Sequence, residues 1–179
     1  RLGAQAGGLC KFTAGALDHR PEEGRKYAQR LGVDNERAYG DWQDMLEKEI
    51  RREDRIDLVT VATPNDTHFQ ITKEFLSAGF NVLCEKPMTM SVEEGEEIVN
   101  IAQKSGKICA VNYAYSAYPM VRQARAMVRS GEIGKVRLVV TNFSHGHHSN
   151  QSDADNPRVR WRYDPTMAGV SGQFADCGI

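Results

Sequence analysis

The stretch NVLCEKPMTMSVEE, residues 81–94, decides the fold. Its first four residues form a short apolar run, which is typical of a strand buried in a parallel sheet. Ser91, followed three residues later by Glu94, is a capping box and predicts that a helix begins at this point. A buried strand that leads directly into a capped helix is part of a β-α-β unit. Between strand and helix stand the residues EKP, 85–87, whose two charges need an explanation.

The same alternation continues on both sides of this stretch. Upstream, IDLVTVATP (residues 56–64) predicts another strand buried on both faces. The helix after it has Thr67 and Gln70 as a capping box and Gly79 at its end. Downstream, ICAVNYAY (residues 108–115) predicts one more strand. This order favours a parallel sheet with helices on both faces.

The N-terminal part extends the pattern. KFTAGALD (residues 11–18) predicts a strand, and helices are expected over residues 20–33 and 41–50. Pro21 suits the first turn of the former helix. The predicted fold class is therefore α/β, a Rossmann-like, doubly wound parallel sheet.

After Tyr118 the pattern changes. A helix is predicted from Pro119 to Gly131. KVRLVVTNF (residues 135–143) then alternates between apolar and more polar positions, which predicts an antiparallel strand with one wetter face. SHGHHSNQSDADNP (residues 144–157) is predicted to be a polar loop. A domain change is therefore expected near residues 112–120, before this helix and strand.

Composition excludes several classes of partner. The chain has 179 residues, and 23 Lys and Arg nearly balance 24 Asp and Glu, for a net charge of -1. We therefore expect no nucleic acid and no membrane as partner. No apolar run approaches the roughly 18 residues that a membrane span needs. The scattered cysteines form no CxxC pair and are expected to be small buried thiols in a reducing cytoplasm; they are Cys10, Cys84, Cys109 and Cys177.

Polar residues follow three of the predicted strands. Asp18 follows the first, the segment from Thr63 to His68 follows the second, and Glu85 and Lys86 follow the third. In a doubly wound sheet, ligands bind beyond the carboxyl ends of the strands. Three polar strand ends on one edge of the sheet favour a binding site over a merely solvated edge.

Asp18 has two interpretations. A carboxylate there could accept hydrogen bonds from the ribose hydroxyls of an adenine dinucleotide, or it could cap the helix that begins near Pro21. Arg20 could hold a 2′-phosphate, although Asp18 would repel that phosphate, so NAD is preferred to NADP. The glycine-rich loop that cradles the pyrophosphate is absent, since GAQAGG does not follow a strand.

Lys86 also has two interpretations. An ammonium at a strand exit, held by Pro87 and a cis Lys–Pro bond, could polarise a substrate hydroxyl or carbonyl. It could equally be a surface lysine paired with Glu85.

Four motifs in order resemble one family. VATPNDTH, GFNVLCEKPMTMSVEE, YPMVRQARAMVRSGEIGKV and WRYDP…GQFADCGI are similar to the Gfo/Idh/MocA family of nicotinamide-dependent oxidoreductases. EKP alone is weakly specific, but the ordered set is strongly specific. The resemblance implies that residues 1–115 are an N-terminally incomplete dinucleotide-binding domain. Residues 116–179 would then begin an α+β domain with a mostly antiparallel open sheet for substrate binding and oligomer contacts.

The resemblance also assigns roles. Lys86 matches the catalytic lysine, and Asp176 matches an aspartate that binds substrate and orients the catalytic base. The base itself, a histidine, would follow Ile179. Cofactor contacts are implied for Asp18, Arg20, Ala62, Thr63, Pro64, Asn65, His68, Glu85, Lys86, Trp161 and Arg162. Substrate contacts are implied for Lys86, Tyr115, His145 and Asp176. For Trp161, Arg162 and Tyr115, simple packing is the equal alternative.

Some features depart from the family pattern. The glycine triplet usual before the aspartate is replaced by GVSG, residues 169–172. The chain begins RLGAQAGG without a methionine, and we expect it to be an internal piece of a longer protein that lacks the first Rossmann strand. HGHH, residues 145–148, could place two histidines on one face for zinc, but no acidic or cysteine partner is near, so no metal is expected.

The expected function is an NAD(P)-dependent dehydrogenase of a sugar, inositol or related polyol, cytoplasmic and homo-oligomeric as a dimer or tetramer. Two alternatives stay open. One is a non-catalytic sensor or regulator that binds the dinucleotide. The other is an NAD-dependent glycosidase of the same family, in which the cofactor undergoes no net turnover.

Overall fold

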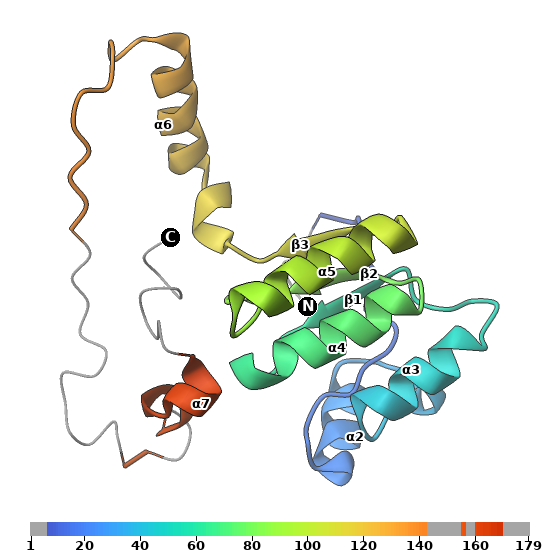
Figure 1. Ribbon diagram of the computed structural model, residues 1–179. Coiled ribbons are helices and arrows are strands. Elements are labelled where there is room, and N and C mark those ends of the chain that lie inside the picture. Colours follow the sequence, from blue (N-terminus) through green and yellow to red (C-terminus); the bar gives the residue numbers. More distant parts are fainter. Residues whose placement is uncertain (1–6, 143–154, 157–159, 170–179) are drawn as a thin grey trace.

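The structure is a computed structural model that describes residues 7–142, 155–156 and 160–169. Its centre is a three-stranded parallel sheet in the order β1-β2-β3 (Figure 1). The strands are β1 (Leu58–Val61), β2 (Asn81–Cys84) and β3 (Cys109–Val111). Crossover helices α4 (Asn65–Ser77) and α5 (Val92–Ser105) join them and lie side by side on one face. The predicted α/β, Rossmann-like parallel fold is confirmed.

Burial of the strands differs from the prediction for Ile56–Pro64. Along β1 buried and exposed residues alternate, and Leu58 keeps 45% of its surface exposed. Val59 and Val61 are buried. The prediction that both faces are buried is wrong for this strand, because among the described residues α4 and α5 cover only one face.

The main core lies between the sheet and these two helices. Val82 and Cys84 from β2 pack there against Phe75 from α4 and Ile98 from α5, all almost completely buried. Phe75 meets Phe80 edge to face, with ring centroids 5.6 Å apart. Removing this apolar surface from water is the main stabilising term for the sheet.

The segment Lys11–Asp18 does not form the predicted strand. Its backbone makes one parallel bridge, Gly15 with Ala38, through hydrogen bonds of 3.1 Å to Arg37 O and from Tyr39 N. A strand needs a continuous partner, and no other described segment pairs with this one. The helices predicted next are present as α2 (Pro21–Arg30) and α3 (Trp42–Ile50), with a 3-10 turn η1 (Asn35–Arg37) between them.

A buried ion pair anchors this N-terminal part to the sheet. Glu49 in α3 is fully buried and accepts two hydrogen bonds from Arg37, at 2.7 and 3.0 Å. It also accepts one from the Tyr39 hydroxyl at 2.6 Å and one from the Ile56 backbone at 3.0 Å. Burial raises the pKa of Tyr39 to about 12, and the Glu49 carboxylate adds to the effect. Burial also opposes ionisation of Glu49, but its four hydrogen bonds leave its pKa below the usual value.

The two predicted capping boxes have different outcomes. For α5, Ser91 Oγ accepts from the Glu94 backbone at 3.2 Å as predicted, while the Glu94 carboxylate accepts from Met90 N instead of Ser91 N. For α4 the prediction is wrong, because the chain turns at Pro64 and the helix begins at Asn65. Thr67 therefore lies inside the helix, where its hydroxyl donates to Pro64 O at 2.7 Å. Gly79 follows the helix end with a positive φ of 82°, as predicted.

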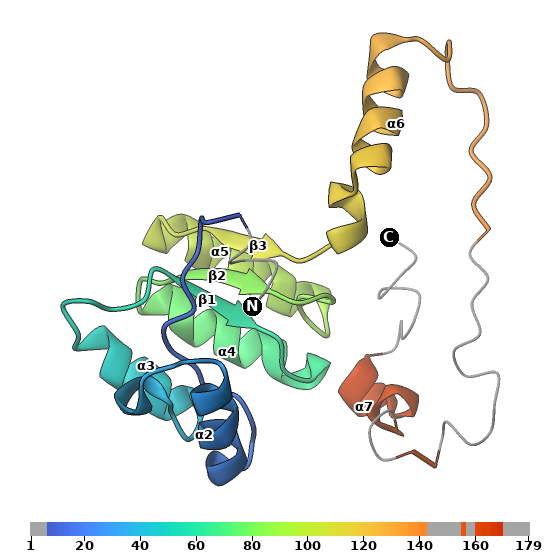
Figure 2. The same ribbon diagram turned by 180° about the vertical axis from the view of Figure 1, so that it is seen from behind.

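Beyond β3 the chain leaves the sheet. A 3-10 turn η2 (Ala114–Ala117) leads into α6 (Pro119–Ser130), which ends at Gly131 as predicted and stands away from the sheet in both views (Figures 1 and 2). The strand predicted over 135–143 is absent from its described part, 135–142, where no described segment pairs with it. Leu138 and Val140 are 80% and 82% exposed.

The last described elements return to the sheet. They are η4 (Arg160–Tyr163) and α7 (Pro165–Ala168), and α7 contacts α4. Within the described residues no helix is long and apolar enough to cross a membrane. The predicted buried thiols are found only in part: Cys84 is buried and Cys109 half-buried, but Cys10 is exposed, and these three are free.

Candidate active site

The carboxyl ends of the strands form one polar edge. Hydrogen bonds of 2.8 Å join Glu85 N to Val61 O and Asn112 N to Cys84 O, so the parallel pairing continues one residue beyond the strands. This places Glu85 beside Asn112, whose side-chain amide donates to the Glu85 carboxylate. Asn112 was missed by the sequence reasoning. The signal that could have found it is its position directly after a predicted strand, as for Glu85.

Lys86 lies half-buried on this edge. Its backbone N–H donates to the second carboxylate oxygen of Glu85 at 3.3 Å. The Lys86–Pro87 peptide bond is cis, as predicted. The Glu85 carboxylate accepts hydrogen bonds from the Asn112 side-chain amide and from the Lys86 backbone. The surface ion pair between the Glu85 and Lys86 side chains, which the sequence left open, stays a prediction.

His68 reaches the same turn from inside. It lies in the first part of α4, where it is 1% exposed. One ring nitrogen, Nδ1, lies 2.7 Å from Pro87 O, and the other, Nε2, lies 2.8 Å from Thr63 O. The sequence suggested that His68 lies along the cofactor, but both of its ring nitrogens are engaged by the protein. Thr63, Pro64 and Ala62, by contrast, are exposed beside it.

Asp18 carries a strong anionic character. Its carboxylate accepts hydrogen bonds from Arg20 at 2.9 Å (backbone), 3.0 Å (Nε) and 3.2 Å (Nη2). The hydrogen bonds from the Arg20 side chain and backbone lower the pKa of Asp18 to about 2. Asp18 and Arg20, both predicted to contact the cofactor, are therefore hydrogen-bonded to each other. A ribose or a phosphate that binds here would have to contact this ion pair. Asp18 caps no helix here, since α2 has no side-chain cap.

Gly24 explains why Asp18 can sit so close to α2. A Cβ at this buried position would lie 3.3 Å from the Asp18 backbone nitrogen. Only glycine allows the first turns of the helix to approach the Asp18 backbone this closely.

The returning segment brings distant residues to the edge. Asn65 Nδ2 donates to Ala168 O at 3.3 Å, across 103 positions of sequence. Trp161 and Arg162 lie in η4, which packs against α7, and the Arg162 guanidinium stacks on the Trp161 ring at 5.1 Å. The fold thus brings this segment to the start of α4, as a border of the proposed cofactor site requires.

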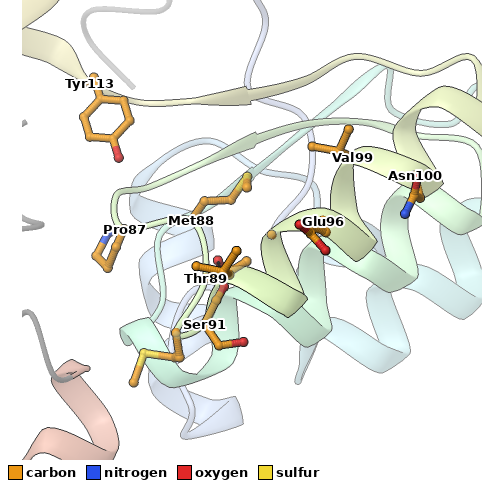
Figure 3. Close-up of a pocket in the computed structure, with 11 residues that line it drawn as sticks. Pro87, Met88, Thr89, Ser91, Glu96, Val99, Asn100 and Tyr113 are labelled. Atoms are coloured by element: carbon orange, nitrogen blue, oxygen red, sulfur yellow. Dashed lines mark hydrogen bonds between the residues drawn. The ribbon is translucent and has the colours of Figure 1, made fainter.

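A groove of about 730 Å³ opens beside the EKP turn (Figure 3). Pro87 and Tyr113 line one end, and residues of the first turns of α5 line the other. Tyr115, for which the resemblance implies a substrate contact, lies in η2 and packs edge to face on Tyr118, with ring centroids 5.5 Å apart. The chain turns after Tyr113, so that of the two tyrosines Tyr113 is the one that lines the groove.

Two predicted substrate residues, His145 and Asp176, lie outside the described residues. So does the HGHH cluster for which zinc was considered. Among the residues that are described, no group of three His, Cys, Asp or Glu side chains could hold a metal ion.

The geometry fits a nicotinamide dinucleotide in its donor set. The exposed segment at 62–64 and Lys86 follow neighbouring strands of the sheet, and Asp18, in a segment outside the sheet, is an anionic group of the kind that binds ribose hydroxyls. The fold and this edge define a Rossmann-type, dinucleotide-binding class of protein.

Comparison with known proteins narrows the class. Residues 7–113 match the family described as oxidoreductase family, NAD-binding Rossmann fold, and residues 121–179 match the GFO/IDH/MocA C-terminal domain. The chain belongs to the Gfo/Idh/MocA oxidoreductase family, as its motifs suggested.

Individual relatives agree. The uncharacterized oxidoreductase YfiI of Bacillus subtilis (strain 168) is 41% identical over 93% of this chain and 42% of its own length. The D-xylose 1-dehydrogenase (NADP(+)) of Hypocrea jecorina is 29% identical over 94% of this chain and 42% of its own. The chain thus spans about 42% of the length of these curated relatives.

Solved structures of an inositol dehydrogenase homolog from Azotobacter vinelandii are also similar. The complex with NAD+ has a TM-score of 0.89 and 43% identity, covering 94% of this chain and 43% of that one. The complex with NADH and myo-inositol has a TM-score of 0.80 and 42% identity, covering 87% and 40%.

Proposed function

We propose that the protein is an NAD-dependent dehydrogenase acting on a hydroxyl group of a sugar, inositol or related polyol. The observation that carries this proposal is the edge formed by Glu85, Lys86 and Asn112 at the ends of adjacent parallel strands. Support comes from the relatives, which include an inositol dehydrogenase homolog with bound NADH and myo-inositol and a D-xylose dehydrogenase.

When bound, NAD accepts a hydride from the carbinol carbon of the substrate. Asp18 would accept hydrogen bonds from the adenosine ribose, and the segment from Ala62 to Asn65 would lie along the cofactor. Glu85, held by Asn112, would stand near the nicotinamide ribose. Trp161 and Arg162 would border this site.

Lys86 would donate a hydrogen bond to the substrate oxygen and stabilise negative charge there as the hydroxyl proton passes to the catalytic base, the histidine that the family resemblance implies. Asp176 would anchor a substrate hydroxyl, and His145 would contact the substrate. Tyr115 would also contact the substrate, and Tyr113, which lines the groove beside Pro87, is a second candidate for such a contact.

NAD is preferred to NADP because Asp18 occupies the Arg20 guanidinium that a 2′-phosphate would need.

The protein would have two domains, with residues 1–115 binding the dinucleotide and residues 116–179 beginning the substrate domain. It would form a homo-oligomer of two or four subunits in the cytoplasm. Cys10, Cys84 and Cys109 are free thiols, which suits a reducing compartment.

The direct test mixes the intact protein with NAD or NADP and a panel of inositols, aldoses and sugar acids, and follows absorbance of the reduced nicotinamide. Reduction with one substrate class supports the proposal and names the substrate. No reduction across the panel, with cofactor binding confirmed separately, would favour the sensor or the glycosidase that recycles its NAD.

A single substitution tests the proposed role of Lys86. Lys86→Met should lower kcat about 100- to 1,000-fold, because one charge-stabilising donor is lost, while the Kd for NAD changes little. Lys104→Met, in the last turn of α5, is the matched control and should leave kcat unchanged. Unchanged turnover in Lys86→Met would refute this role.

A further inference from the structure

His68 bridges the turns that follow two neighbouring strands. Thr63 belongs to the turn after β1, and Pro87 belongs to the turn after β2. The imidazole contacts the carbonyl oxygen of each, at 2.8 and 2.7 Å. It is 1% exposed, so water does not compete for either contact.

The chemistry of these contacts dictates the form of the ring. A carbonyl oxygen only accepts hydrogen bonds, and neutral imidazole has one N–H and one bare nitrogen. In either neutral tautomer a lone pair would face a carbonyl oxygen at less than 3 Å. Only the imidazolium donates at both contacts.

The surroundings agree with this form. Burial disfavours the charge, but hydrogen bonding to Cys84, Pro87 and Thr63 outweighs it and raises the pKa of His68 to about 9. Cys84, on β2, is a titratable group beside the ring. The geometry that favours the charge is the pair of carbonyl dipoles, at 2.7 and 2.8 Å from the two ring nitrogens.

We infer that His68, as a buried imidazolium that donates to both turns, is a positioning residue that sets Lys86 against the Thr63–Asn65 segment. Pro87 directly follows Lys86 in the chain, so the carbonyl that His68 contacts belongs to the same turn as Lys86. Thr63 lies in the segment proposed to contact the cofactor. The role of His68 in positioning Lys86 rests on the proposed function, whereas the protonation state of its ring does not.

The first experiment determines the protonation state of the His68 ring and needs no measurement of enzyme activity. Histidine in the intact protein is labelled with ¹⁵N, and the two ring nitrogens of His68 are assigned from the signal lost in His68→Gln. The inference expects two protonated nitrogens at neutral pH, each with a one-bond coupling to hydrogen. A bare nitrogen at either position overturns it, and if His68→Gln does not fold, assignment through the bonds of the wild-type ring gives the same answer.

The second experiment is kinetic. His68→Gln keeps one donor and should lower kcat about 100-fold while raising KM for NAD much less, since a small displacement of a reacting group costs about that factor. Gln70→Ala, two residues on and exposed, is the matched control and should keep wild-type kcat. A folded His68→Gln with kcat within threefold of wild type overturns the inference. Failure of the proposed function would appear separately, as an unchanged Lys86→Met.

Discussion

The sheet region buries its apolar residues, whereas the segment that follows the sheet leaves its apolar residues exposed. In residues 56–112, Phe75, Phe80 and Val82 are at most 1% exposed. In residues 119–142, Leu138, Val139 and Val140 are 75–82% exposed, and no residue of α6 is buried. Both regions carry apolar residues at regular spacings in the sequence. The difference teaches that periodicity marks a face for burial, but burial itself needs a partner surface.

The largest expected effect compares one residue from each region. Phe75→Ala should lower the free energy of unfolding by about 3–5 kcal/mol, because it empties a filled core site. Leu138→Ala should change it by less than about 0.5 kcal/mol. Chemical denaturation of both variants measures the two values. A large loss at Leu138 would break the comparison and mean that a surface outside the described residues covers it.

The buried ion pair gives the next effect. Glu49→Gln should cost about 3 kcal/mol, since it removes a fully buried carboxylate that pairs with Arg37 and leaves Arg37 only its longer contact to Asp54. Glu47 lies two residues before Glu49 and forms a surface ion pair with Arg51. Glu47→Gln removes this pair and should cost less than about 1 kcal/mol.

The same pair has a pH signature with a defined sign. The pKa of Glu49 is lowered in the folded state, so its contribution is present above its ordinary pKa of 4.5 and is lost as pH falls below that value. Denaturation midpoints measured across acid pH should therefore drop less steeply for Glu49→Gln than for Glu47→Gln. Equal slopes would contradict the linkage.

His68 should make a smaller contribution to the pH dependence of stability, in the opposite direction to that of Glu49. Its pKa is raised from 6.5 to about 9, so its stabilisation is full below pH 6.5 and is lost as pH rises towards 9. Over this pH range the free energy of unfolding of the intact protein should fall by up to about 2–3 kcal/mol. His68→Gln should not show this fall. Parallel pH profiles for the two proteins would show that the ring is not charged in the folded state.

The smallest effect concerns cofactor choice at the N-terminal edge. Asp18→Ser should release Arg20 and weaken NAD binding about 10-fold while strengthening NADP binding. Isothermal titration with both cofactors measures the change, with Asp34→Ser, which caps η1, as control. A loss of both affinities in equal proportion would mean that the pair only supports the fold.

Much of the fold was predictable because it is local. Ser91 caps α5, Gly131 ends α6, and EKP lies at the exit of β2, each as the sequence indicated. The misses needed information from elsewhere in the chain. Lys11–Asp18 and 135–142 have strand composition, but a strand exists only when a neighbour pairs with it. The start of α4 was misjudged because the turn at Pro64 competes with the cap at Thr67.

The sequence by itself determined the parallel α/β fold, the polar strand ends and the family, because short-range periodicity, turn residues and motif order are properties of neighbouring residues. Only the tertiary structure decided that Asn112 holds Glu85, that Tyr113 rather than Tyr115 lines the groove, and that His68 is buried between two carbonyls. These facts join residues that lie on different strands and turns. Parallel pairing of β2 with β3 places Glu85 beside Asn112, and packing of α4 against the sheet brings His68 within hydrogen-bonding distance of Thr63 and Pro87.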